Sequence, residues 1–565
     1  METEKRREIW LPIVLLAFLT CVLAARSFFS FCQSDESFYA ALTHRLWMGE
    51  HMITDEWNST QFYVPIVVPF YSLYIAVRGS TDGVLLFLRL LYLLFAVITG
   101  GRLFFLSLKE TKSGFYALLS AAIVLLFSRG NIQGVSYYNL CMLCNVSAFC
   151  SFMAAFEHTA AARNLLFLWT GVQLACAVLC NPFLAPLVMA AFLVALLATR
   201  YKREMLWIIA GILLMAAIYC AFLLHGNRVG DLLGGLTYVL NNPEQSSISE
   251  NVISALIQTA RLSKYVAVPA LIMSAIVLLH KSNDRLCLAY LALQGLLMVL
   301  SAFRSGFYLC GAILIPMTVV TFPLCLSGYQ NRSVRAVMLY VIGLLNAAAY
   351  TVASNTGVDA GTVGFCISAV AGIWLIGETG VKWNRSATRL LTLAMLMLGM
   401  LVPMFCQRVI GVYRDAPLVQ LNTRLQQGPA RGLYTTKEHA EQYDAVCEAL
   451  RSLSAERPEG KILFCKTLPW AYLCTPYGFG TPSPWRIHTE DLQNYYAIHE
   501  ENRADFICIL SENVGGWEQS PFNRNPGVSN PNAFDYDGAF WEEVETAPVL
   551  METPELTIFE MREIW

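Results

Sequence analysis

The feature that most constrains the fold of this chain is the recurrence of apolar runs that are each long enough to cross a lipid bilayer. The runs at 11–24 and 207–224 are examples, and short polar patches separate such runs along most of the sequence. Backbone amides must be satisfied internally in hydrocarbon, so each run of about 17 to 25 apolar residues predicts a helix. Only 14% of the residues are charged. The sequence therefore predicts a polytopic α-helical membrane protein, and not a soluble enzyme.

We expect about thirteen membrane-spanning helices. They are predicted at 10–31, 83–106, 114–130, 141–157, 164–181, 183–199, 206–225, 263–280, 286–303, 307–327, 334–353, 361–379 and 387–406. Lysine and arginine gather in alternate connections, for example at Arg6, Lys109 and Arg203, and positive charge marks the cytoplasmic side. This predicts a multi-pass protein of the cell membrane with a cytoplasmic amino terminus. An odd number of spans puts the loop at 32–82 and the tail outside the cytoplasm.

The chain divides by composition into a membrane domain at 1–406 and a polar tail at 407–565. In the tail, 436–453 predicts an amphipathic helix, and 461–465 and 506–510 predict short buried strands. The tail is thus expected to be a small extracytoplasmic α/β domain. Its aromatic residues either offer faces for sugar rings or form the core of that domain. These residues are Trp470, Tyr472, Tyr477, Trp485, Tyr495 and Tyr496.

Charge and cysteine content exclude two classes of protein. The formal net charge is −2, which leaves no positive excess to hold nucleic acid. Most of the 17 cysteines lie in apolar runs, where a thiol behaves as a small hydrophobe, so they do not form a disulfide framework. In the tail, Cys447, Cys465, Cys474 and Cys508 lack a metal-ligand spacing, and the spacing does not reveal whether any of them pair.

The loop at 32–82 is too long for a simple connection and too apolar to be free. Its acidic start at Asp35 and Glu36, followed by Phe38 and Leu42 at helical spacing, predicts an interfacial helix that ends near Gly49. A second apolar segment follows at 65–77 and is broken by prolines. It is too short to span comfortably, so we expect it to lie on the outer leaflet or dip into it.

This order of features resembles the amino-terminal module of the GT-C glycosyltransferase superfamily, in particular the bacterial protein-mannosyltransferase-like and aminoarabinose-transferase-like enzymes. The likeness rests on Asp35-Glu36-Ser37-Phe38-Tyr39, on Arg45-Leu46 before Gly49, and on Leu88-Arg89-Leu90 at the start of the next span. It covers about the first hundred residues. Beyond them the likeness is one of topology, with about thirteen spans and an outer carboxyl-terminal domain.

The resemblance implies sugar transfer from a polyprenyl-phosphate donor to a glycan, lipid or protein acceptor of the cell envelope. Asp35 is then the general base that takes the proton of an acceptor hydroxyl. Glu36 shares the proton, orients the acceptor or points away, since adjacent residues on a helix face different directions. A structural alternative exists for both residues. Acidic side chains at a helix amino terminus also cap amides and complement the helix dipole.

A lipid phosphate leaving group needs cations at the outer membrane boundary. Arg304 is the preferred candidate because it is the only cation of a very short outer turn, next to Tyr308. Further binding candidates are Arg89, Arg129 and Tyr39, and Arg261 and Lys264 are also near predicted outer ends. The structural alternative for each cation is a snorkelling side chain that meets lipid headgroups.

No cofactor motif is found, and a divalent metal ion, although possible, lacks support. Many members of the superfamily carry a second acidic residue in the outer loop after the third span, and here 133–139 contains none. Asp55 and Glu56 of the first loop are the remaining carboxylate candidates for the binding site. Two other functions stay open: a transporter or flippase of lipid-linked glycans, and a GT-C-like binding protein without catalysis. The absence of a clear internal repeat argues against transport.

Overall fold

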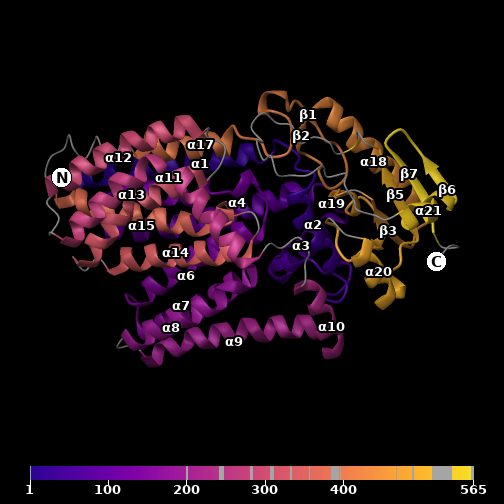
Figure 1. Ribbon diagram of the computed structural model, residues 1–565, viewed down its shortest axis with the longest axis horizontal. Coiled ribbons are helices and arrows are strands. Elements are labelled where there is room, and N and C mark those ends of the chain that lie inside the picture. Colours follow the sequence, from indigo (N-terminus) through magenta and orange to yellow (C-terminus); the bar gives the residue numbers. More distant parts are fainter. Residues whose placement is uncertain are drawn as a thin grey trace.

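The computed structural model is a bundle of helices with a small mixed sheet near its carboxyl end (Figure 1). It describes residues 2–198, 202–240, 247–279, 284–305, 311–330, 334–354, 357–382, 394, 396–465, 467–485, 489–511, 514 and 538–561. The bundle contains α1 (Glu2–Arg26), α4 (Val84–Thr111), α5 (Gly114–Leu126), α6 (Tyr137–Ala155), α7 (Ala160–Cys180), α8 (Ala185–Ala198), α9 (Lys202–Leu224), α11 (Ile248–Leu279), α12 (Asp284–Ser305), α13 (Gly311–Gln330), α14 (Val334–Ala353), α15 (Thr362–Lys382) and α17 (Val402–Val409).

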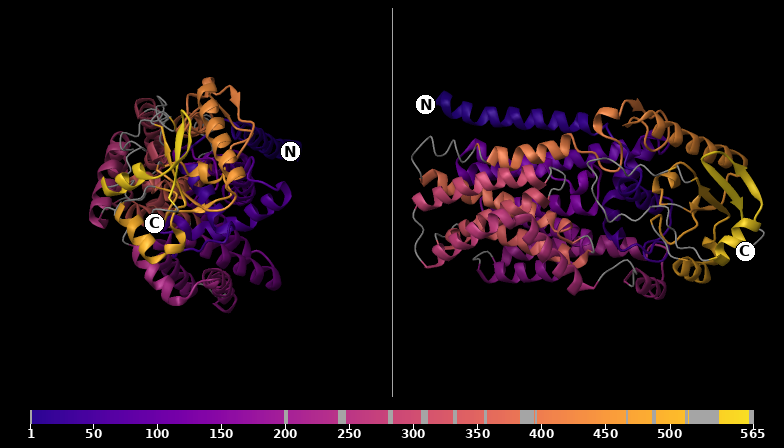
Figure 2. Two further views of the ribbon diagram at one scale, coloured as in Figure 1. Left: turned by 90° about the vertical axis from the view of Figure 1, so that its right-hand side faces the viewer. Right: turned by 45° about the horizontal axis from the view of Figure 1, so that its top comes forward.

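The amino terminus lies at one end of the bundle, and the sheet with its helices lies at the other end (Figures 1 and 2). This arrangement is the one required if the amino terminus and the tail face opposite sides of a membrane. The short helix α10 (Val229–Leu240), which connects α9 to α11, also lies at the end that carries the sheet.

Eight helical segments of the described residues are long and apolar enough to cross a membrane. They are Ile9–Arg26, Ser59–Arg78, Val84–Thr111, Tyr137–Ala155, Ala160–Cys180, Lys202–Leu224, Ile248–Leu279 and Val334–Ala353. Every predicted span overlaps a helix, but several of these helices, such as Gly114–Leu126, are shorter than that criterion. The chain has the helical architecture of a polytopic membrane protein, and the number of crossings stays a prediction.

The segment Ser59–Arg78 does not run through the bundle. It consists of a 3₁₀ turn (Ser59–Tyr63) and α3 (Val64–Arg78). The backbone N–H of Trp57 donates to the carbonyl of Pro482 at 2.8 Å, and the hydroxyl of Thr81 donates to the carbonyl of Leu473 at 2.8 Å. Both ends of the segment are therefore held by the tail. It begins and ends at the same end of the bundle, although its length and composition would permit a crossing.

Helix α2 (Asp35–Trp47) begins and ends close to where the sequence predicts, but its surroundings differ from the expectation. All its residues from Glu36 to Leu46 are buried, so it is not an interfacial helix with one lipid-facing side. It packs against α3, α4 and the short helix α19 (Pro469–Tyr472). Helix α2 is covered by protein because α19 of the tail packs against it.

The tail contains a five-stranded sheet in the order β4-β3-β5-β7-β6. Its strands are β4 (Gly478–Phe479), β3 (Lys461–Phe464), β5 (Phe506–Leu510), β7 (Leu556–Glu560) and β6 (Val549–Glu552), with β1 (Thr423–Arg424) and β2 (Tyr434–Thr435) in a separate pair. The strands β4, β3 and β5 are parallel, whereas β7 and β6 are antiparallel to their neighbours. The helices of the tail are α18 (Lys437–Glu456), α19, α20 (Thr489–Ile498) and α21 (Gly538–Thr546).

The predicted helix and both predicted strands of the tail are confirmed. Helix α18 starts after Thr436, whose hydroxyl accepts a hydrogen bond from the N–H of His439, as expected of an N-cap. The short strands β4, β6 and β7 were not predicted. Among the aromatic candidates, Trp470 and Tyr495 are fully buried, and Tyr472, Tyr477 and Tyr496 are at most 5% exposed. These five form the core of the tail and not an open sugar-stacking surface.

Candidate functional site

The Asp35 side chain lies where the first loop meets the start of the tail. Its carboxylate accepts a hydrogen bond from the Tyr413 hydroxyl at 2.9 Å and forms an ion pair with Arg414 Nη1 at 2.8 Å. The Asp35 side chain keeps 16% of its surface exposed. Ser34, at the N-cap position, makes no side-chain capping bond, and its hydroxyl accepts a hydrogen bond from Arg414. The partners recorded for the Asp35 carboxylate thus belong to the tail.

The chain around Tyr413 and Arg414 is held in place by buried polar contacts. The Arg26 guanidinium, at the end of α1, donates to the carbonyls of Val409 and Gly411 at 2.9 and 2.8 Å. Asp415 is fully buried and accepts from the backbone N–H of Phe31 at 2.6 Å. These contacts join the chain on both sides of Asp35 to the chain on both sides of Arg414, so the two side chains meet in a fixed geometry.

Three non-glycine residues near this junction have left-handed backbone conformations. Their φ angles are +73° at Ser30, +62° at Asn131 and +53° at Arg414. The Asn131 side chain bridges Gly411 and Arg408, since it donates to the carbonyl of the first and accepts from the guanidinium of the second. Such conformations cost of order 1–3 kcal/mol for residues such as serine and arginine, less for asparagine, and concentrate at functional sites. The strain marks this junction as a candidate site.

A second ion pair lies beside the first. Arg129 Nε donates to Asp359 Oδ2 at 3.0 Å, and the guanidinium stacks 4.2 Å from the centre of the Tyr138 ring. Asp359 comes from a 3₁₀ turn (Gly357–Asp359) between α14 and α15. The second carboxylate near the predicted centre therefore comes from a late loop, and not from 133–139.

Tyrosine rings connect the two ion pairs. The Tyr39 ring centre lies 5.9 Å from that of Tyr137 and 6.2 Å from that of Tyr63. Gly130, next to Arg129, approaches the Tyr413 ring so closely that an added Cβ would lie 3.1 Å from it. Burial raises the pKa of Tyr39 and Tyr413 above the ordinary value of tyrosine. Both phenols stay protonated at neutral pH, and the Tyr413 hydroxyl donates its proton to Asp35.

Glu36 and Arg89, predicted as a catalytic and a phosphate-binding residue, bind each other. The guanidinium of Arg89 donates from Nε and Nη2 to the two carboxylate oxygens at 2.7 and 2.6 Å. Both side chains are buried, with 4% and 1% exposed. Gly134 packs over the carboxylate, where an added Cβ would lie 3.0 Å from Glu36 Oε1. This pair ties α2 to α4, and its geometry is that of a structural ion pair.

Asp55 and Glu56 lie at the contact between the first loop and the tail. Asp55 accepts from Asn502 Nδ2 at 3.0 Å. Glu56 forms an ion pair with Arg45 at 2.9 Å, and Arg45 also binds Glu50 and the carbonyl of Thr481. Burial raises the pKa of Glu56 to about 7, and Arg45 offsets only part of that effect. These carboxylates dock the tail.

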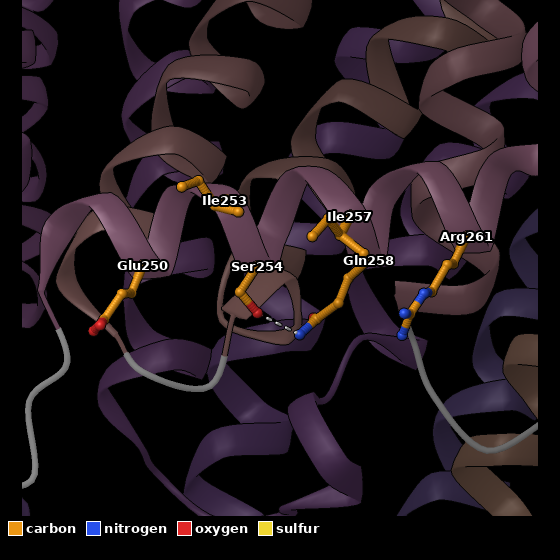
Figure 3. Close-up of a pocket in the computed structure, with 6 residues that line it drawn as sticks. All are labelled: Glu250, Ile253, Ser254, Ile257, Gln258 and Arg261. Carbon is orange, nitrogen blue, oxygen red and sulfur yellow. Dashed lines mark hydrogen bonds between the residues drawn. The ribbon is translucent and has the colours of Figure 1, made fainter.

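The structure describes the side chains of only some of the remaining predicted cations. Arg304 lies in the last turn of α12, while its side chain and Tyr308 fall outside the described residues, so their predicted role is untested. Lys264 stacks on the ring of its neighbour Tyr265. Arg261 lines a cavity of about 390 Å³ along α11, together with Glu250, Ile253, Ser254, Ile257 and Gln258 (Figure 3).

This cavity adjoins the second ion pair. Gln258 Oε1 accepts from the backbone N–H of Val358, the residue before Asp359, at 3.2 Å. Ile253 and Ile257, on the same face of α11, are 58% and 47% exposed. The lining has the anion Glu250 at one end and the cation Arg261 at the other, with the isoleucines between them (Figure 3). The bond from Val358 to Gln258 places this surface next to Asp359 and its partner Arg129.

The two carboxylates of this junction are each paired with an arginine. Asp35 forms its ion pair with Arg414, and Asp359 is bound to Arg129. Within the described ranges, no cluster of three or more His, Cys, Asp or Glu residues is placed to hold a metal, so the predicted cofactor stays a prediction. The arrangement of one partly exposed carboxylate, two arginines and several phenols suits an anionic, hydroxyl-rich ligand.

The comparison with known proteins leaves the family open. No protein-family model matches the chain, and no curated protein matches it. The residues that sequence reasoning missed are Tyr413, Arg414 and Asp359. A signal for them existed, since the first two follow the last predicted span and Asp359 is the acidic residue of the predicted outer turn at 354–360.

Proposed function

We propose that this protein is an integral-membrane glycosyltransferase that moves a sugar from a polyprenyl-phosphate donor to an acceptor outside the cytoplasm. The observation that carries the proposal is the Asp35–Arg414 pair. A partly exposed carboxylate lies 2.8 Å from an arginine whose backbone is held in a strained conformation, at the end of the bundle that carries the tail. An ordinary helix cap does not require this arrangement.

The site supplies the groups that such a transfer needs. The acceptor hydroxyl gives its proton to Asp35 as its oxygen bonds to the anomeric carbon, while the bond from that carbon to the phosphate oxygen breaks. The phosphate leaves with the electron pair of that bond, and Arg414 and Arg129 stabilise the resulting charge. The partly exposed Tyr137 ring offers an apolar face and a hydroxyl to the sugar, and the buried Tyr39 ring packs behind it.

The cavity along α11 suits the lipid part of the donor. Exposed isoleucines provide an apolar surface for a prenyl chain, and Arg261 is the cation that lines the same surface. The contact of Gln258 with Val358 brings this surface next to the Arg129–Asp359 pair. A donor bound along α11 would thus present its phosphate to the arginines of the site.

Incubation of the purified full chain with radiolabelled polyprenyl-phosphate sugars and a membrane extract tests the proposal. We expect label to move to an acceptor fraction with the wild type and not with Asp35→Asn. Glu441→Gln, an exposed substitution on α18, serves as the control that should transfer normally. Absence of transfer for every donor in the panel would contradict the proposal.

One observation favours a flippase of lipid-linked glycans as the second candidate. Arg102 in α4 donates to the hydroxyls of Ser147 and Ser151 of α6, both at 2.6 Å. Gln173 of α7 completes the cluster through hydrogen bonds to the same two serines. Ionisable residues within membrane helices commonly mark pathways for charged substrates.

The Arg102 cluster gives a discriminating variant. If the protein translocates a lipid phosphate through the bundle, Arg102→Met should abolish movement of a fluorescent lipid-linked sugar between the leaflets of reconstituted vesicles. If it is a transferase, the same variant should leave sugar transfer close to the wild-type rate. Asp35→Asn should abolish sugar transfer by a transferase, and it should leave the movement of the lipid-linked sugar between leaflets unchanged if the protein is a flippase.

A further inference from the structure

Two cysteines of the tail lie in direct contact. The Sγ atoms of Cys447, on α18, and Cys474, just after α19, are 2.8 Å apart. Sulfur atoms joined in a disulfide lie about 2.0 Å apart. The two side chains therefore need a shift of about 0.8 Å to form a covalent bond, which rotation of two side chains supplies.

The surroundings hold the two thiols together. Cys447 is only 1% exposed and lies four residues after Tyr443, whose ring centre is 4.7 Å from that of Trp470 of α19. At Gly428 an added Cβ would lie 3.2 Å from Cys447 Sγ, so the backbone covers that sulfur closely. The contact between α18 and α19 is thus packed around the sulfur pair.

We propose that Cys447 and Cys474 are joined by a disulfide in the mature protein. In this reaction two thiols lose two protons and two electrons and form one sulfur–sulfur bond. The electrons pass to the disulfide of a thiol–disulfide oxidoreductase, which is reduced to a dithiol. The predicted location of the tail outside the cytoplasm provides the oxidising compartment in which such bonds form and persist.

The structure also indicates the order of the reaction. Cys474 is the less buried of the two and lies near the cation Arg451, so it is the thiol that an oxidoreductase reaches first. Its mixed disulfide is then attacked by the Cys447 thiolate, which releases the reduced oxidoreductase.

The bond would stabilise the helix that carries the candidate site. Helix α19 packs against α2, and the carbonyl of Leu473, next to Cys474, accepts from the Thr81 hydroxyl at 2.8 Å. A disulfide between α18 and the end of α19 restrains the segment on which α2 rests. We expect reduction to loosen the tail from the first loop as well as to destabilise the tail itself.

Peptide mapping of the wild-type chain tests the proposal without any substitution. Cells that express the full chain are quenched with acid, free thiols are alkylated under denaturing conditions, and the protein is digested without reductant. We expect one linked pair of peptides that contains Cys447 and Cys474 and is two hydrogen atoms lighter than the sum of the two. Complete alkylation of both residues, or a link from either one to Cys465 or Cys508, would overturn the proposal.

Thermal unfolding with and without reductant gives a second measurement. Reductant should lower the Tm of the wild-type tail by several degrees, because the unfolded chain gains the conformational freedom of the opened loop. The variant with Cys447→Ala and Cys474→Ala should have the same Tm under both conditions. Cys465→Ala, which removes a different buried thiol of the same domain, should keep the shift. A wild-type Tm that reductant does not change would count against the bond.

Discussion

The Asp35 carboxylate binds the Arg414 guanidinium at 2.8 Å and accepts a hydrogen bond from the neighbouring Tyr413 at 2.9 Å, although Tyr413 lies 378 positions later in the sequence. The contact closes the carboxyl-terminal end of α1 against the start of the tail, since Arg26 binds the carbonyls of Val409 and Gly411 in the same place. The proposed reaction centre is therefore also a joint between the membrane domain and the tail.

Asp35 should be essential for transfer and of modest importance for stability. Asp35→Asn can still accept from Tyr413, so it should fold, but an amide cannot take the acceptor proton. Loss of a general base typically costs roughly 10² to 10⁴ in rate. The loss is checked by measuring the transfer rates of Asp35→Asn and Asp35→Ala under conditions in which the chemical step limits the rate. Wild-type transfer by the Asn variant would remove Asp35 from the reaction.

Replacement of Arg414 by glycine should destabilise the protein less than replacement by alanine. Its φ of +53° is strained for alanine and free for glycine, so Arg414→Gly should be more stable than Arg414→Ala by about 1 kcal/mol, while both lose transfer activity. The free energy of unfolding in detergent measures the difference. Arg431, whose φ is not positive, is the matched control at which glycine should be the less stable substitution. If glycine were less stable than alanine at position 414 as well, backbone strain at Arg414 would be excluded.

Breaking the buried Glu36–Arg89 pair should destabilise the membrane domain strongly. Arg89→Ala leaves a buried carboxylate without its partner, which typically costs about 3 to 5 kcal/mol. Arg431→Ala, which removes a half-exposed partner of Asp82, should cost less than about 1 kcal/mol. The free energies of unfolding of Arg89→Ala and Arg431→Ala in detergent measure the difference. Replacing Glu36 and Arg89 together by apolar residues should recover part of the stability that Arg89→Ala loses. If the double replacement recovered nothing, the pair would not be purely structural.

Glu56 should make the contact between loop and tail weaken as the pH rises. Burial raises the pKa of Glu56 to about 7 from an unfolded value of about 4.5, so between these values the folded state holds a proton that the unfolded state has released. The contribution of this proton to the free energy of unfolding is complete below pH 4.5 and is lost as the pH rises to about 7. Between pH 5 and 7.5 the Tm of Glu56→Gln should therefore change less than that of the wild type or of Glu441→Gln.

The tail should lie outside the cytoplasm. The predicted cytoplasmic clusters of lysine and arginine and the odd number of predicted spans both require it. A reporter that works only in the cytoplasm, fused after residue 565, should stay silent, whereas the same reporter at the amino terminus should be active. Activity of the carboxyl-terminal fusion would overturn the predicted topology and the oxidising compartment that the Cys447–Cys474 bond requires.

The sequence alone predicted elements whose causes are local. Apolar runs predicted the bundle helices, Ser34 and Asp35 marked the start of α2, and Thr436 marked the start of α18. The strands β3 and β5 were found because each is a continuous buried run, whereas β4 has only two residues and carries no such signal. Caps and apolar runs act within a few turns of chain, so they can be recognised without knowledge of the rest.

Only the tertiary structure decided which charges meet. Glu36 and Arg89 were predicted for separate chemical roles and instead neutralise each other, and Asp35 found its cation in Arg414 of the tail. Arg129 likewise pairs with Asp359, which enters from a loop late in the chain. The partner of a charged group depends on which helices pack side by side. That packing is fixed by the burial of side chains from distant segments, which no local pattern in the sequence records.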